Sequence, residues 1–188
     1  MLTSKDVTQM GKHSDFPRRP RDFYPTPFEA VVPLLTHLDD HTQFDEPCAG
    51  NGTLISHLES RQHTCIRASD IEPKSDAIST ENALKLIDCK GDCFITNPPW
   101  PMPGQNGDPT VKLAQHLSDI APCWLLLNAD VMHNRYFGKL SDRCIKIVSV
   151  GRVSWEQNRI KGKENSAWFY FNKNCLNKFA PIFYGRAA

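Results

Sequence analysis

The chain has 188 residues, enough for one ordinary domain with its own hydrophobic core but not comfortably for two. Lys plus Arg is 22 and Asp plus Glu is 21, so bulk charge neither favours nor excludes a nucleic-acid partner. The sequence contains no long apolar run that would span a membrane, and residues 1–10 lack the apolar stretch of a signal peptide. The seven cysteines are scattered and form no C-x-x-C pair, which indicates a reduced, cytoplasmic protein. Cys89 and Cys93 have no histidine at ligand spacing, so no metal site is expected.

Residues 1–21 are polar and basic, and they predict a flexible arm in front of one domain over 22–188. Thr26 can cap a helix and Pro27 suits its first position, which predicts a helix over 27–38. From there strands and helices alternate. Strands are expected at 44–47, 64–69, 93–96, 124–128, 144–150 and 167–172, and helices at 53–60, 76–81, 111–120 and 129–137. Residues 101–110, rich in Pro, Gly, Asn and Asp, predict a loop.

This alternation predicts an α/β fold, a mostly parallel sheet with helices on both faces. The last two expected strands resemble a closing antiparallel hairpin, with a polar excursion between them over 156–165. In such sheets the ligand-binding loops follow the carboxyl ends of the strands. The residues that remain after Trp100 are mostly needed for the sheet, so a separate target-recognition domain is not expected.

The first such loop is the segment 46–52, with the sequence EPCAGNG, between a predicted strand and a predicted helix. Gly50 and Gly52 would let the backbone approach a ligand without interference from a Cβ atom, and Glu46 can bind an amine or a hydroxyl. The Lys-Ser/Thr of a P-loop and the third glycine of a dinucleotide fingerprint are both missing. The segment therefore favours a nucleoside that carries an amino acid, although a plain strand-to-helix turn would look the same. Asp70, at the end of the next expected strand, can bind ribose hydroxyls or simply cap a turn.

The most informative tetrapeptide is NPPW, residues 97–100, which directly follows an apolar strand. Two consecutive prolines fix two φ angles, and Pro98 also restricts Asn97. The Asn97 side-chain oxygen and the Pro98 carbonyl then form a rigid pair of acceptors for the two hydrogens of an amino group. Trp100 offers a flat face on which a base can stack, although a rigid turn with a core tryptophan is the alternative.

Taken together, these motifs resemble the amino-methyltransferases of class I fold, and among them the small phage and bacterial DNA adenine-N6 methyltransferases. The resemblance runs from Asp22 onward and rests on YPTP (24–27), EPxxGxG (46–52), Asp70 and NPPW, with a tail over 151–153 and 166–169 that also looks like this group. It implies a Rossmann-like, seven-stranded sheet, S-adenosylmethionine as the cofactor, and methylation of a planar amino or amide nitrogen.

The resemblance also implies roles for individual residues. Asn97, Pro98, Pro99 and Trp100 would be catalytic and would hold the target base. Where the family has an acid that contacts the cofactor's adenine, this chain has Asn82, whose amide can still make the contact. The residues expected around the cofactor are Tyr24, Thr26, Pro27, Glu46, Pro47, Ala49, Gly50, Gly52, Asp70, Ile71, Asn82 and Asn97.

Four functions remain open from the sequence. The leading one is adenine-N6 methylation of DNA; the others are adenine-N6 methylation of RNA, methylation of a protein glutamine, and a non-catalytic module that binds cofactor or DNA. Basic residues interleaved with an aromatic in the excursion suit a nucleic-acid backbone, although a solvated hairpin tip would look similar. Taken with its first flank, over 152–165, the excursion offers as candidate contacts Arg152, Trp155, Arg159, Lys161 and Lys163.

Overall fold

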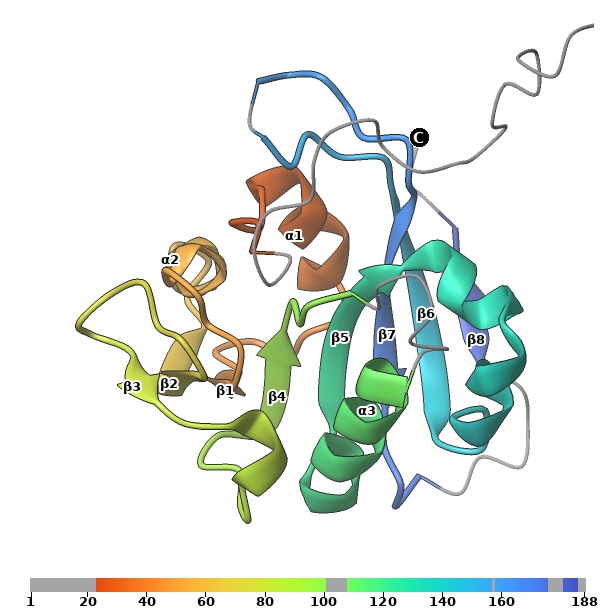
Figure 1. Cartoon of the computed structure of the whole chain (residues 1–188), viewed down its shortest axis with the longest axis horizontal. Helices are drawn as coiled ribbons and strands as arrows, with labels where there is room; N and C mark the ends of the chain where they lie inside the picture. The colour runs from red at the N-terminus through yellow and green to blue at the C-terminus, as the bar shows by residue number, and fades with distance from the viewer. Residues whose placement is uncertain (1–22, 101–107, 157, 176–180, 186–188) are drawn as a thin grey trace, which may run out of the picture.

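The computed structural model describes residues 23–100, 108–156, 158–175 and 181–185. Within these residues, an eight-stranded sheet with the order β3-β2-β1-β4-β5-β7-β6-β8 forms the centre of the molecule (Figure 1). The antiparallel pairings are those of β7 with β5 and β6, and the other neighbouring strands run parallel. The predicted fold class is therefore confirmed, with eight strands where seven were expected.

The elements have the following bounds. The strands are β1 Gln43–Glu46, β2 Thr64–Asp70, β3 Ser79–Thr80, β4 Cys93–Thr96, β5 Cys123–Asn128, β6 Cys144–Gly151, β7 Ser166–Phe171 and β8 Ile182–Tyr184. The α-helices are α1 Phe28–Leu35, α2 Thr53–Glu59 and α3 Asp108–Ile120, and the 3-10 helices are η2 Ala83–Lys85, η3 Ala129–His133 and η4 Arg135–Lys139.

Several local predictions were wrong. The helix expected over 76–81 does not form, because this segment turns back and Ser79 pairs with Ser69 to make β3. The helix expected over 129–137 is two short 3-10 helices separated by Asn134. Residues 108–110, expected in a loop, are the first turn of α3, while 101–107 lie outside the described residues. The predicted flexible arm also lies outside them.

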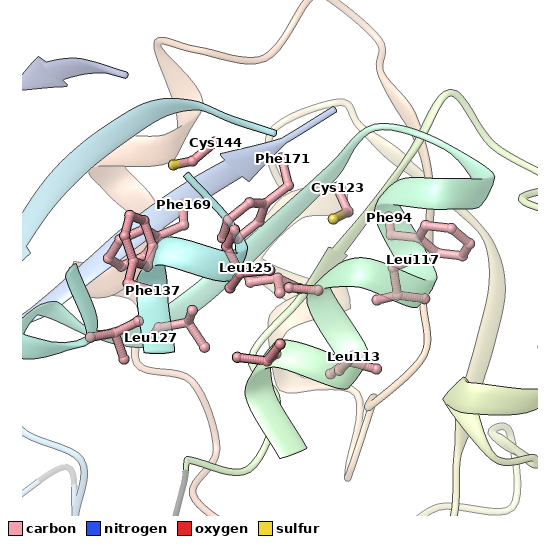
Figure 2. Packing of buried hydrophobic residues seen from close by; sticks show 14 of the residues in the cluster. Phe94, Leu113, Leu117, Cys123, Leu125, Leu127, Phe137, Cys144, Phe169 and Phe171 are labelled. Carbon is pink, nitrogen blue, oxygen red and sulfur yellow. The ribbon is translucent and has the colours of Figure 1, made fainter. Parts of the chain in front are cut away.

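Alternating side chains of the strands supply two hydrophobic cores, one on each face of the sheet. Phe94 of β4 belongs to the core under α3, whereas its neighbour Ile95 belongs to the core under α1 and α2. Figure 2 shows the first of these, in which Leu113 and Leu117 of α3 and the rings of Phe169 and Phe171 lie together. Each fully buried side chain of this size contributes about 1.5–3 kcal/mol, so both helix layers are held firmly on the sheet.

A buried hydrogen bond fixes α1 on the second face. The indole Nε1 of Trp168, on β7, donates to the carbonyl of Ala30 at 2.7 Å, and Trp168 is fully buried. The start of α1 is thereby placed beside the carboxyl ends of the central strands. In the part of the chain that the structure describes, no helix is both long and apolar enough to cross a membrane.

Candidate active site

A cavity of about 320 Å³ lies where β1, β2 and β4 end, which is the size of a small-molecule site. Glu46 ends β1, Asp70 ends β2 and Asn97 directly follows β4, so three loops meet at one edge of the sheet. The predicted residues that line this cavity are Tyr24, Thr26, Glu46, Ala49, Gly50, Asp70, Ile71, Asn97 and Pro99. Residues about 20 to 70 positions apart in the sequence therefore lie together, as expected for loops that follow the carboxyl ends of parallel strands.

The glycine loop has a backbone that requires glycine. Gly50 has φ +54° and Gly52 has φ +81°, both in the left-handed region. A Cβ atom on Gly50 would also lie 2.6 Å from the Phe23 ring, so this ring occupies the place of a side chain. The Gly50 N–H donates to Asp70 Oδ2 at 2.8 Å, and its carbonyl accepts from the N–H of Lys74 at 2.8 Å. The loop is therefore held rigidly at the cavity.

Asp70 organises the backbone around the cavity. Its Oδ2 accepts from Gly50, and its Oδ1 accepts from the N–H of Glu72 at 2.8 Å. Each carboxylate oxygen has a second lone pair, and the residue lines the cavity. The carboxylate can therefore also accept hydrogen bonds from two hydroxyls of a ligand.

Glu46 is the most deeply buried ionisable residue of the site and is only 2% exposed. Its Oε2 has no hydrogen-bond partner among the described residues, although the residue lines the cavity. Burial raises the pKa of this carboxyl well above its ordinary range, and the nearby Asp70 carboxylate raises the pKa further. A buried carboxyl of this kind is suited to a cationic amine of a ligand, which would supply the missing partner.

Asn97 is oriented by Thr26. The Asn97 Nδ2 donates to the Thr26 hydroxyl at 3.1 Å, and Thr26 is buried. Since the amide nitrogen is bound to the protein in this way, the Oδ1 is left as an acceptor at the cavity wall. The expectation that Thr26 caps the following helix was wrong, because Pro27 is the N-cap and the helix has no side-chain cap.

Trp100 lies in the core beside the cavity and is not part of its lining. It is 8% exposed, and its Nε1 donates to the carbonyl of Leu126 at 3.1 Å. The ring of Trp155 meets it edge-on, at 5.4 Å and 87°, and Tyr24 lies 6.4 Å from Trp155. The open stacking face expected of Trp100 is therefore largely covered by neighbours, and Tyr24 is the member of this aromatic cluster that reaches the cavity.

Five other predicted residues also lie outside the lining, namely Pro27, Pro47, Gly52, Asn82 and Pro98. Asn82 is the N-cap of η2, where its Oδ1 accepts from the N–H of Leu84 at 2.9 Å. Pro98 is buried below the wall that Pro99 forms. Gly52 and Pro27 act at the starts of α2 and α1, where they set the direction of the backbone.

Eight lining residues were not predicted from the sequence: Phe23, Pro25, Cys48, Asn51, Thr53, Leu54, Glu72 and Lys74. Most adjoin predicted ones, so proximity to the motifs could have found them. Phe23 adjoins Tyr24, but its contact with Gly50 could not be found in this way, because that contact joins distant parts of the chain. Cys48 is a poor nucleophile, since burial raises the pKa of its thiol to about 12.

Two of the basic residues of the excursion, Arg159 and Lys161, line a second hollow that adjoins the cavity. This groove shares Pro25, Asn51 and Thr53 with the cavity lining. Arg152 and Lys163 are exposed elsewhere on the excursion, and Trp155 is half-buried beside Trp100. The predicted nucleic-acid contacts are therefore divided between different surfaces.

No family model and no curated protein sequence matches the chain. Solved structures do match. A protein assigned as an RNA methyltransferase from Pyrococcus horikoshii has a TM-score of 0.59 at 12% identity, over 86% of this chain and 91% of that one. A protein assigned to the class I S-adenosylmethionine-dependent methyltransferases from Listeria monocytogenes has a TM-score of 0.60 at 11% identity, over 90% and 68%.

The modification subunit assigned to a type I restriction enzyme of Vibrio vulnificus has a TM-score of 0.54 at 12% identity, over 88% of this chain and 47% of that one. At such low identity these likenesses concern the fold. The chain therefore has the Rossmann-like fold of class I methyltransferases, with the candidate site at the carboxyl edge of its parallel strands.

Proposed function

We propose that the protein transfers a methyl group from S-adenosylmethionine to the N6 amino group of adenine in DNA. The observation that carries this proposal is the position of Asn97. Its amide is held by Thr26 in the wall of a cavity that also contains Glu46, Gly50 and Asp70. The residues proposed to accept the amino group and to bind the cofactor's nucleoside thus line one cavity.

The cofactor's three chemical parts find matching groups in the cavity. The Glu46 carboxyl, with its unpartnered Oε2, would bind the ammonium group of the methionine moiety. The Asp70 carboxylate would accept from the ribose hydroxyls, and the exposed Ile71 would cover the adenine. Thr26 and Tyr24 would lie at the methionine end. When bound, the cofactor supplies an electrophilic methyl carbon on its sulfonium sulfur.

The protein's own contribution to the reaction is to position the acceptor nitrogen. The Asn97 Oδ1 and the Pro98 carbonyl would accept the two hydrogens of the amino group and direct its lone pair at the methyl carbon. The new N–C bond forms as the C–S bond breaks, and the surplus proton then leaves to solvent. A dedicated general base is not required. A base within a duplex must first be flipped out, at a cost of a few kcal/mol.

An aromatic ring in the cavity wall favours a nucleobase over a glutamine side chain. Tyr24 lines the same cavity as Asn97, and a flat ring suits a flat base. The resemblance to small DNA adenine methyltransferases favours DNA over RNA. RNA methylation is the second candidate, since one structural neighbour is assigned as an RNA methyltransferase.

The test asks separately whether the protein transfers a methyl group and which polymer accepts it. The purified protein is incubated with methyl-labelled S-adenosylmethionine and duplex DNA, single-stranded DNA, RNA or cell-extract protein, and cofactor binding is measured by calorimetry. N6-methyladenine in DNA supports the proposal. Label in RNA or protein would keep the reaction and replace the substrate. Cofactor binding without any transfer would favour a non-catalytic module, and failure to bind cofactor would overturn the proposal entirely.

A further inference from the structure

The groove beside the cavity has about 820 Å³ and lies between α1, the start of α2 and the residues Ser154, Arg159 and Lys161. Its lining is Pro25, Pro27, Phe28, Glu29, Asn51, Thr53, His57, Ser154, Arg159 and Lys161. It is continuous with the cavity through Pro25, Asn51 and Thr53, which border both. A polymer that presents one of its units to the cavity has room to continue along this groove.

The electrostatic character of the groove is cationic. Arg159 and Lys161 are exposed, and neither forms an ion pair within the described part of the chain. The guanidinium of Arg61 lies 4.9 Å from the centre of the ring of Phe28, a residue of the groove lining. The one acid of the lining is Glu29, and its Oε1 accepts a hydrogen bond from the N–H of Ser154. With two cations and one carboxylate, the lining keeps a net positive charge that attracts an anionic ligand.

The segment that carries these cations is held in a defined shape. The Val153 carbonyl accepts from the N–H of Gly162 at 3.0 Å, closing the loop at its base. Asn158 Oδ1 accepts from both the Ser154 hydroxyl, at 3.2 Å, and the N–H of Ile160, at 2.9 Å. Arg159 has φ +67°, a left-handed conformation that costs a non-glycine residue about 1–2 kcal/mol. In this conformation Arg159 lines the groove.

We propose that this groove binds the sugar-phosphate backbone of the substrate strand through Arg159 and Lys161, and so delivers the target base to Asn97. The inference rests on the proposed function, because the bound polymer is the methyl acceptor. Backbone contacts carry no sequence information, so the groove fixes position and affinity whatever the recognition sequence is. Arg152 and Lys163, which do not line the groove, are expected to contribute less.

The test is a double variant, Arg159→Gln with Lys161→Gln, compared with Lys112→Gln with Lys139→Gln. The control removes the same charge from exposed lysines of α3 and η4, on the other side of the sheet. Binding of a fluorescent single-stranded oligodeoxynucleotide is followed by anisotropy over a range of salt concentrations. Each lost phosphate contact lowers the slope of log K against log salt by about 0.7, so the groove variant should lose about 1.4 in slope and bind about 25-fold more weakly at 0.1 M salt.

The control pair should lose less than a third of that slope, and thermal unfolding checks that both variants fold. With saturating DNA the groove variant should methylate at the wild-type kcat, while its KM rises. Groove and control variants with equal salt slopes would overturn the groove assignment and leave the methylation reaction intact. Wild-type protein that binds no nucleic acid but methylates another polymer would instead overturn the nucleic-acid substrate itself.

Discussion

Replacing Glu46 by glutamine probes the cofactor site at its most buried ionisable group. The wild-type carboxyl has a raised pKa, chiefly because it is buried and secondarily because Asp70 is near. In the unfolded chain it loses its proton near pH 4.5, whereas the folded, ligand-free protein keeps the proton to a higher pH. The folded state therefore binds more protons in this window, and Glu46 lowers the free energy of unfolding as pH rises from about 4.5 to the folded pKa. Glutamine does not titrate, so Glu46→Gln escapes this loss.

The same substitution should weaken cofactor binding. A hydrogen bond to a charged group contributes about 1.5–3 kcal/mol, which corresponds to about 10- to 150-fold in Kd. Since the carboxylate is the form that binds an ammonium group, wild-type affinity should increase with pH through the folded pKa of Glu46. The affinity of Glu46→Gln should lack this component. Glu59→Gln, on the exposed surface of α2, is the control and should match the wild type.

Two assays check this pair of effects: urea unfolding of ligand-free protein between pH 4.5 and 8, and calorimetric titration with S-adenosylmethionine over the same range. As pH rises, the unfolding free energy of the variant should increase relative to that of the wild type. The variant should nevertheless bind the cofactor more weakly. Parallel pH profiles of stability together with unchanged cofactor affinity would refute the reasoning, because Glu46 would then neither be perturbed by burial nor face the ligand.

Further substitutions test other parts of the site. Asn97→Ala should abolish methyl transfer while cofactor affinity stays within about threefold of wild type. Thr26→Val should lower kcat and Thr26→Ser should restore it, because only serine can accept a hydrogen bond from Asn97. Steady-state kinetics and calorimetry check these outcomes, and an active Asn97→Ala would remove Asn97 from the mechanism. Gly50→Ala should destabilise the protein by more than the ~1–2 kcal/mol expected for Gly52→Ala. Both glycines have positive φ, but only a Cβ atom on Gly50 meets the Phe23 ring. Equal losses of unfolding free energy, measured by urea unfolding, would contradict the contact. Trp100→Phe should lower the free energy of unfolding by about 1–3 kcal/mol through loss of its bond to Leu126, and full loss of activity at unchanged stability would mean that Trp100 contacts substrate directly.

The parts of the fold that the sequence predicted well are those with strong local signals. The predicted bounds of β4, β5, β7 and α2 lie within one or two residues of the observed ones. Apolar runs mark these strands, and a glycine turn precedes α2. Where tertiary contacts decide the structure, the predictions were wrong. Ser79 and Thr80 lack a strand pattern and become β3 only because the end of β2 is open to pairing. Asn134 interrupts a segment whose composition favoured one helix.

The candidate site shows the same division. Glu46, Asp70 and Asn97 lie at one cavity, as expected from their positions at the ends of parallel strands, which meet at one edge of the sheet. The buried position of Trp100 matches the alternative of a core tryptophan, but its partners could not be foreseen, since Trp155 and the Leu126 carbonyl are distant in the sequence. The pairing of Thr26 with Asn97 was likewise hidden, because the pattern around Thr26 equally suits a helix cap.

The most direct test of the central claim is the chemical position of a transferred label. Wild-type protein is given S-adenosylmethionine with a trideuterated methyl group and unmethylated DNA, and the nucleosides are separated and identified by mass spectrometry, with Asn97→Ala in parallel. We expect trideuterated N6-methyladenine from the wild type and none from the variant. Label on a ring nitrogen or carbon, or equal label from Asn97→Ala, would contradict this expectation.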